Sequence, residues 1–159
     1  MNRARILITG SNGFIGKNLV TRLEELKDFN IDTFNRNNSV DELFQMVKIA
    51  DFVVHLAGVN RPKNNSEFNT VNKELTEIIC DAIYAAKKNI PLIFTSSSQV
   101  EQKNAYSESK IAAELAVKKL ANETENPVFI YRLPGVFGKW CKPNYNSVVA
   151  TFCHNISHD

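Results

Sequence analysis

Short apolar runs alternate along this chain with longer segments in which apolar residues recur at helical spacing. The runs that predict buried strands are residues 5–9, 31–34, 52–56, 92–95 and 128–131. The segments that predict helices are residues 14–26, 40–50, 68–88, 105–121 and 148–156. Regular alternation of strand and helix predicts the α/β class, as a doubly wound parallel sheet with helices on both faces. Such sheets bind ligands beyond the carboxyl ends of their strands, so the residues that follow each strand are the first candidates for function.

Composition and charge narrow the class of protein. The chain has 159 residues, 43% hydrophobic and 23% charged, which fits a globular domain and excludes a disordered one. A formal net charge of +2 argues against nucleic-acid or membrane partners. Apolar runs are too short for a signal peptide or a bilayer span, and three cysteines form no disulfide framework, so a cytoplasmic protein is expected. His154 and His158 lack the neighbouring ligands of zinc patterns, so no metal site is expected.

The first predicted strand leads straight into a glycine-rich turn, and the turn opens the first helix. It reads Thr-Gly-Ser-Asn-Gly-Phe-Ile-Gly over residues 9–16. Glycine lets the backbone turn tightly and approach a pyrophosphate, while the helix amino terminus offers free N–H groups and a favourable dipole. The pattern predicts a Rossmann-like dinucleotide site. The residues expected to contact the cofactor here are Gly10, Asn12, Gly13, Phe14, Ile15 and Gly16.

The end of the second strand should select between the two nicotinamide dinucleotides. An acidic residue there would bond the ribose 2′-hydroxyl of NAD, whereas an arginine suits the 2′-phosphate of NADP. The residues after Phe34 are Asn35 and Arg36, and Arg36 lies about 20 residues beyond the last glycine of the turn, where the selecting residue is expected. Arg36 therefore favours NADP(H), with a solvated loop arginine as the competing interpretation.

A set of serine, tyrosine and lysine residues follows the fourth predicted strand. Residues 96–98 are three serines, and Tyr106 stands four positions before Lys110 at the start of a predicted helix. That spacing puts both side chains on one helix face. A free tyrosine, with a pKa of about 10, is a poor acid–base group near neutral pH, and a nearby ammonium would stabilise its phenolate. Tyr84 and Lys88 share the spacing without the serines, so we interpret Tyr84 as a surface or packing residue.

Five motifs, taken in order, resemble those of extended short-chain dehydrogenases/reductases that act on nucleotide sugars. They are the glycine turn at 9–16, His-Leu-Ala-Gly at 55–58, Ser-Ser at 96–97, Tyr106-x-x-x-Lys110 and Arg-Leu-Pro-Gly-Val-Phe-Gly at 132–138. The resemblance covers the whole chain. Residues 139–147 are more narrowly similar to the NADPH-dependent reductases of capsular polysaccharide synthesis, which act on UDP-4-keto-6-deoxy amino sugars on the way to UDP-N-acetyl-L-fucosamine.

The resemblance implies roles for individual residues. Tyr106 would be the proton donor and acceptor, and Lys110 would hold the nicotinamide ribose and tune Tyr106. Ser97 fits the catalytic serine best, with Ser98 as the alternative. Further cofactor contacts implied by the resemblance are Leu56, Ala57, Gly58 and Asn72. Substrate contacts implied in the same way are Ser98, Asn144 and Asn146. Gly135 stands where the family usually has an asparagine, so one expected substrate contact is missing.

The expected reaction is NADPH-dependent reduction of the 4-keto group of a UDP-4-keto-6-deoxy-N-acetyl amino sugar. The expected partners are this UDP-sugar and a second copy of the chain, with which it would form a homodimer. Gln99 stands where a dehydratase would need a carboxyl group, which disfavours dehydration. An NAD-dependent nucleotide-sugar 4-epimerase and a non-catalytic NADP-binding sensor stay open as alternatives. We expect residues 1–159 to form one NAD(P)-binding domain, truncated before the family's substrate-binding region and without a further cupin domain.

Overall fold

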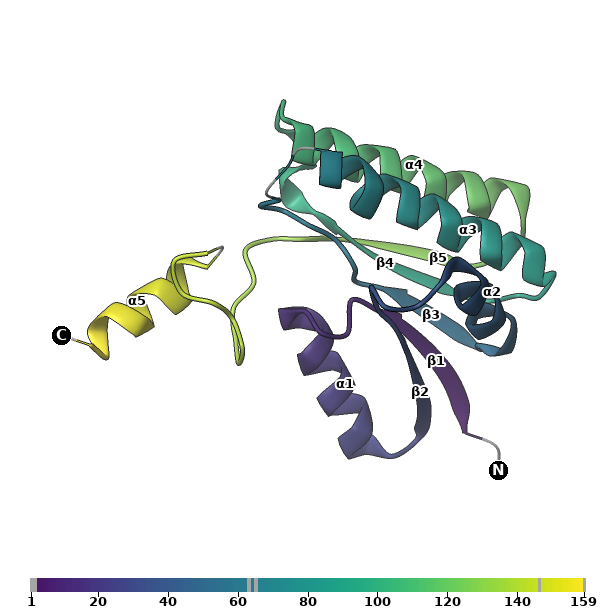
Figure 1. Ribbon diagram of the computed structural model, residues 1–159, viewed down its shortest axis with the longest axis horizontal. Helices are drawn as coiled ribbons and strands as arrows, with labels where there is room; N and C mark the ends of the chain where they lie inside the picture. Colours follow the sequence, from purple (N-terminus) through teal and green to yellow (C-terminus); the bar gives the residue numbers. More distant parts are fainter. Residues whose placement is uncertain (1–2, 63, 65, 146, 159) are drawn as a thin grey trace.

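A computed structural model describes residues 3–62, 64, 66–145 and 147–158 of the chain. Among these residues, five parallel strands form one sheet in the order β2-β1-β3-β4-β5 (Figure 1). The strands are β1 (Ala4–Thr9), β2 (Phe29–Phe34), β3 (Phe52–His55), β4 (Leu92–Ser97) and β5 (Val128–Leu133). The helices are α1 (Phe14–Leu26), α2 (Val40–Ile49), the π-helix η1 (Phe68–Glu74), α3 (Leu75–Ala86), the short 3₁₀ helix η2 (Ser98–Glu101), α4 (Ala105–Glu123) and α5 (Val148–Ile156).

The sheet lies between two layers of helix, which confirms the predicted doubly wound fold. Figure 1 shows α1 on one face and α2, α3 and α4 on the other. Successive residues of β1 point to opposite layers: Leu7 belongs to the larger core under α2, α3 and α4, whereas Ile6 and Ile8 belong to a smaller cluster under α1. Because both faces of the central strands are covered, these strands are apolar at nearly every position, as the short runs in the sequence predicted.

The chain changes the direction of sheet building at β1. It passes from β1 through α1 to β2 on one side, and then returns through α2 to β3 on the other side of β1. Neighbouring strands whose connections leave in opposite directions open a crevice at their carboxyl ends. The sequence predicted a helix and no further strand between residues 36 and 51, and α2 occupies this stretch. The fold therefore places the ligand crevice next to the glycine turn after β1.

Residues 68–88 form two helices of different type, although the sequence predicted one. The π-helix η1 covers Phe68–Glu74, and α3 follows until Lys87 closes it with a left-handed backbone. Hydrophobic spacing cannot reveal such a change, because a π-turn adds a single residue to an otherwise helical pattern.

The strands β4 and β5 run two residues further than predicted, to Ser97 and Leu133, which are register partners. Their polar ends thus reach the ligand side of the sheet.

The helix α5 stands apart from the layers, beyond the carboxyl ends of the strands (Figure 1). Its predicted range, 148–156, is confirmed. None of its residues is buried, and Val148, Phe152 and Ile156 are 64%, 60% and 78% exposed. Across the part of the chain that the structure describes, no helix combines the length and the apolar character needed to cross a membrane.

Candidate active site

A cleft of about 1240 Å³ lies beyond the carboxyl ends of the strands. The predicted site residues that line it are Gly10, Asn12, Gly13, Phe14, Ile15, Gly16, Leu56, Gly58, Ser97, Ser98, Tyr106, Lys110 and Asn144. Ala57 and Asn72 lie directly behind the lining, against Gly10 and Gly58. Arg36 is exposed and does not line the cleft, and Asn146 lies outside the described residues. The structure thus brings together most of a set that the sequence spreads over 135 positions, from residue 10 to residue 144.

The turn after β1 fits a diphosphate because its backbone packs too closely for side chains. Gly10 has a left-handed backbone, with φ +72°, and a Cβ there would lie 2.6 Å from Ala57 N. A Cβ on Gly16 would overlap the Gly10 carbonyl. The helix α1 starts at Phe14, its N-cap Gly13 has no capping side chain, and its first turn holds no acidic residue. The first N–H groups of α1 are therefore left for an anion in the cleft.

The end of β2 adds one side chain, that of Asn35, which was absent from the predicted site. The Asn35 side-chain oxygen accepts hydrogen bonds from Ser11 Oγ at 3.1 Å and from Asn12 Nδ2 at 3.0 Å. Asn35 thereby joins the β2 end to the glycine turn, and residues 35–39 contain no carboxylate. The sequence carried a signal for this residue, because Asn35 directly follows the strand, but only the fold shows which side chains it meets.

Strand alternation separates the serines at the end of β4. Ser96 is buried, and its hydroxyl donates to Glu114 Oε1 at 2.6 Å on the α4 side of the sheet. Ser97 lines the cleft, where its Oγ accepts from Gln99 N–H at 3.1 Å. Since a hydroxyl both accepts and donates, the Ser97 proton remains available to an oxygen atom in the cleft. Ser98 is exposed at the start of η2 and lines the same cleft. This geometry supports Ser97 as a hydrogen-bond donor to substrate.

Tyr106 lies in the first turn of α4, at the wall of the cleft. Asn104 fixes the start of the helix, because its side chain accepts from Ser107 N–H at 2.9 Å. Phe68 of η1 packs against the phenol, with ring centroids 5.9 Å apart and an interplanar angle of 58°. Tyr106 is half-buried, so its ring is held in place while it lines the cleft. Phe68 was not predicted, since nothing local in the sequence relates it to Tyr106.

Lys110 places a buried positive charge one helical turn after the phenol. It is 7% exposed, and its Nζ donates to the Thr95 carbonyl at 3.0 Å and lies 5.0 Å from the centroid of the Phe94 ring. Burial lowers the pKa of Lys110 to about 8, and the Glu114 carboxylate opposes this shift. Because Lys110 is mostly protonated near neutral pH, its ammonium can stabilise a phenolate on the same helix face.

Asn72 supports the cleft from behind. Its Oδ1 accepts from Val59 N–H at 2.8 Å, and its Nδ2 donates to Val59 O at 2.9 Å and to Ser109 Oγ at 3.0 Å. A Cβ on Gly58 would lie 3.2 Å from both Asn72 Oδ1 and Lys110 Nζ. Glycine at position 58 is therefore what lets the β3 end approach these two side chains. The π-helix carries Asn72, in keeping with the frequent occurrence of π-turns at functional sites.

The segment after β5 forms another wall of the cleft and meets the loop after β3. Arg61 of that loop lies over the ring of Tyr145, with the guanidinium carbon 5.6 Å from the ring centroid. Asn144 has a left-handed backbone, with φ 54°, and its N–H donates to Thr151 Oγ1 on α5 at 2.9 Å. Tyr145 does not belong to the predicted site, yet it lines the cleft together with Arg61. This loop contact identifies a side of the cleft that motif spacing does not.

Three residues that were weighed as weaker candidates lie away from the cleft: Tyr84, His154 and His158. Tyr84 is 47% exposed on α3, and Lys87 Nζ lies 3.9 Å from the centroid of its ring, so its interpretation as a surface residue is confirmed. His154 and His158 pack against each other at the end of α5, with ring centroids 4.1 Å apart. Within the described residues, no group of three or more His, Cys, Asp or Glu side chains is placed to hold a metal ion.

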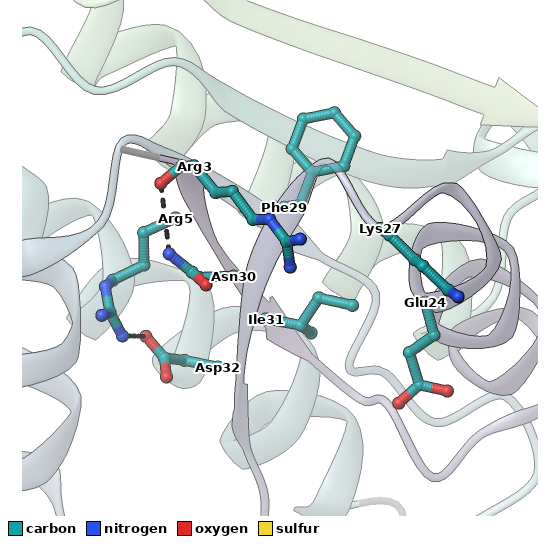
Figure 2. Close-up of a pocket in the computed structure, with 8 residues that line it drawn as sticks. All are labelled: Arg3, Arg5, Glu24, Lys27, Phe29, Asn30, Ile31 and Asp32. Carbon is teal, nitrogen blue, oxygen red and sulfur yellow. Dashed lines mark hydrogen bonds and ion pairs between the residues drawn. The ribbon is translucent and has the colours of Figure 1, made fainter. Parts of the chain in front are cut away.

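A smaller hollow, of about 460 Å³, lies away from the carboxyl ends of the strands, where β1 and β2 begin (Figure 2). Figure 2 shows Arg5 of β1 joined to Asp32 of β2 by an ion pair of 2.9 Å. Asp32 is the acidic residue closest in sequence to the end of β2. Because it pairs with Arg5 and lines this hollow, it does not supply the carboxylate that would mark an NAD ribose site.

Comparison with known proteins agrees with this geometry. The chain matches the model of the "NAD dependent epimerase/dehydratase family" over residues 6–159. It is 48% identical over 155 residues to the UDP-2-acetamido-2,6-beta-L-arabino-hexul-4-ose reductase of Pseudomonas aeruginosa, covering 98% of this chain and 42% of that protein. The crystal structure of the capsular polysaccharide assembling protein CapF from Staphylococcus aureus is 44% identical with a TM-score of 0.82, over 96% of this chain and 42% of that one.

A more distant structure shares the fold alone. RMD from Pseudomonas aeruginosa, complexed with NADPH, is 21% identical with a TM-score of 0.81, over 98% of this chain and 60% of that one. The architecture is therefore shared by proteins whose sequences differ widely. The chain spans only 42% of the length of the curated reductase. Together these findings confirm the resemblance to extended short-chain dehydrogenases/reductases. The chain belongs to the NAD-dependent epimerase/dehydratase family.

Proposed function

We propose that the protein, in its full natural length, uses NADPH to reduce the 4-keto group of a UDP-4-keto-6-deoxy-N-acetyl amino sugar in the synthesis of a capsular or other surface polysaccharide. One observation carries the proposal: a diphosphate cradle, the Ser97 hydroxyl, the Tyr106 phenol and the Lys110 ammonium line a single cleft. The reductase that is 48% identical to this chain supports the substrate class, and the likeness to CapF supports the polysaccharide context.

The residues of the cleft divide the work of a carbonyl reduction. The N–H groups that follow Gly13 would hold the cofactor diphosphate, where the crowded glycine backbone leaves no room for side chains. NADPH, when bound, supplies the hydride for the keto carbon. Ser97 donates a hydrogen bond to the keto oxygen and stabilises the negative charge that develops there. Tyr106 donates its proton to that oxygen, and Lys110 stabilises the resulting phenolate.

Arg36 supports NADPH rather than NADH, as does the lack of a carboxylate at residues 35–39. A guanidinium pairs with a 2′-phosphate, whereas it offers no acceptor to a ribose hydroxyl. Arg36→Ala should therefore weaken NADPH binding about tenfold, the worth of one charge-assisted hydrogen bond, and leave NADH binding nearly unchanged in a fluorescence titration. Lys48→Ala, at an exposed lysine on α2 outside the cleft, is the control for a general loss of positive charge. Equal losses for the two cofactors would count against the assignment.

Tyr106→Phe tests the reaction itself. The change removes one hydroxyl and leaves the ring against Phe68, so NADPH affinity should be unchanged while kcat falls at least about 100-fold. The assay follows loss of NADPH absorbance with a UDP-4-keto-6-deoxy amino sugar. Tyr84→Phe removes the hydroxyl of an exposed tyrosine on α3 and should behave as wild type. Loss of binding with kcat intact would contradict the role proposed for Tyr106.

The same measurements separate the two alternatives. A 4-epimerase would carry tightly bound NAD through purification, visible in its absorbance, and would consume no NADPH. A sensor would bind NADPH without turnover even as wild type, and Tyr106→Phe would cause no loss of its biological role. Either result would replace the reductase proposal.

We also propose that the protein forms a homodimer with α4 at the interface. Ile111 and Leu115 stand one turn apart on α4 and are 41% and 59% exposed. Burying such side chains against a second copy would remove apolar surface from water. Leu115→Glu should turn the dimer into a monomer in sedimentation velocity, and an unchanged mass would contradict this interface.

A further inference from the structure

His55 ends β3 inside the molecule, between the glycine turn and α4. It is fully buried, and each ring nitrogen has a hydroxyl partner. Nδ1 lies 2.6 Å from Oγ1 of Thr9, the last residue of β1, and Nε2 lies 2.9 Å from Oγ1 of Thr76 on α3. Thr9 and His55 are register partners in neighbouring parallel strands, so their side chains emerge side by side on the same face.

The hydrogen bonds around His55 have a single direction, because Thr76 has only one hydroxyl proton. Thr76 Oγ1 donates that proton to the Asn72 carbonyl at 2.6 Å, since a carbonyl can only accept. Thr76 must then accept from His55, whose Nε2 carries the ring proton. In a neutral ring Nδ1 is left as an acceptor, and it takes the proton of Thr9 Oγ1. Thr9 Oγ1 in turn accepts from the Ala57 N–H at 3.3 Å.

The surroundings of His55 keep its ring neutral. Burial and the positive charge of Lys110 lower the pKa of His55 to about 3. The ring packs beside Phe94, with ring centroids 5.4 Å apart. A protonated ring would have N–H donors on both sides, and Thr9 would lose its acceptor. The direction of the hydrogen-bond chain is therefore stable near neutral pH.

We propose that His55 is a positioning residue that sets the spacing between the glycine turn and α4, the helix that carries Tyr106 and Lys110. On one side its chain of hydrogen bonds fixes Thr9, which directly precedes Gly10. On the other side it fixes Asn72, whose amide donates to Ser109 Oγ on α4 at 3.0 Å. Ser109 Oγ in turn donates a hydrogen bond to the Tyr106 carbonyl at 2.7 Å. The inference rests on the proposed function in one respect: it takes carbonyl reduction to be the reaction for which this spacing matters.

The first test needs neither substrate nor cofactor. In the full-length protein with ¹⁵N-labelled histidine, long-range ¹H–¹⁵N spectra should place the His55 ring proton on Nε2 at neutral pH and still show a neutral ring at about pH 5, below the ordinary histidine pKa. The spectrum of His55→Gln identifies which signal belongs to His55. A proton on Nδ1, or a doubly protonated ring at that lower pH, would overturn the inference. This result is the same whether or not the cleft performs the proposed reduction.

The second test asks whether His55 positions or merely fills space. His55→Phe keeps an aromatic ring beside Phe94 but removes both hydrogen bonds, and should raise the Kd for NADPH and lower kcat by about tenfold each. His55→Gln keeps an amide that can donate toward Thr76, and should recover most of both losses. Val47→Ala, in the core under α2, serves as a variant with comparable loss of Tm and should leave Kd and kcat unchanged.

The outcomes of this second test are separable. Unchanged Kd and kcat in His55→Phe, with only Tm lowered as in Val47→Ala, would show a structural role and overturn the inference. If wild type binds NADPH but reduces no UDP-4-keto sugar, the proposed function fails, and the NADPH affinities still decide the role of His55. If His55→Phe does not fold, Thr76→Val replaces it, because that change removes the hydroxyl between His55 and Asn72. It should raise the Kd for NADPH and lower kcat, and a lowered Tm with both constants unchanged would overturn the inference.

Discussion

The buried His55 makes the stability of this protein depend on pH in the mildly acidic range. Its pKa is about 3 in the folded protein, against an ordinary value of 6.5. Between these two values the unfolded chain binds more protons than the folded protein, so the free energy of unfolding falls as the pH falls. The contribution of His55 is therefore fully present above pH 6.5 and is progressively lost as the pH falls from there toward 3.

The size of this effect follows from the difference between the two pKa values. One pKa unit corresponds to about 1.4 kcal/mol. At about pH 5, roughly 1.5 units below the ordinary histidine value and above the folded value, the free energy of unfolding should be about 2 kcal/mol lower. The carboxylates of Asp51 and Glu114 add little between about pH 7.5 and about pH 5, because folding lowers their pKa values from ordinary values of 3.8 and 4.5 that already lie below this range.

Urea unfolding at about pH 7.5 and about pH 5 measures this loss in wild type and in His55→Gln. Glutamine does not titrate, so wild type should lose about 2 kcal/mol more than the variant between the two pH values. Taking the difference also removes any contribution of His154 and His158, which both proteins retain. An equal loss in both proteins would refute the reasoning, because it would mean that His55 is protonated as easily in the folded state as in the unfolded chain.

Three further predictions concern the cleft and its support. Gly58→Ala should lower kcat about tenfold without abolishing folding, since its Cβ would press on Asn72 and Lys110; an unchanged kcat would contradict this close packing. Glu114→Gln should lower the free energy of unfolding in urea by about 2 kcal/mol, because the buried carboxylate accepts two hydrogen bonds from Arg132. The kcat/KM profile should fall above pH 8, where Lys110 loses its proton, and a profile flat to about pH 10 would argue against an essential ammonium.

The parts of the site that sequence could predict are those encoded by neighbouring residues. The glycine turn needs only a strand before it and a helix after it, and Tyr106 and Lys110 need only helical spacing. The rule that parallel strands collect ligands at their carboxyl ends then brings such local motifs to one edge of the sheet. Tyr84 shows why spacing alone is insufficient: it has the same helical relation to Lys88 and lies outside the cleft.

The remaining parts depend on pairs of residues that are distant in sequence. Asn35 bonds to Ser11 across 24 positions, and Phe68 packs on Tyr106 across 38. Neither pair has a periodic signal, because each partner is placed by a different element. The π-helix lacks a periodic signal as well, and its Asn72 side chain bonds to the backbone of Val59, a loop residue 13 positions earlier.

Strand register links the hydrogen-bonded groups around His55 to the glycine turn. A one-residue slip between β1 and β3 would turn His55 to the opposite face, away from Thr76, and leave buried hydroxyl and ring groups without partners. The polar groups therefore penalise the wrong register more strongly than an apolar strand end would. The correct register is also what sets Gly10 against Ala57, where only glycine fits. The register that gives His55 its partners is thus also the register that packs the glycine turn against Ala57, and a change at His55 should affect both.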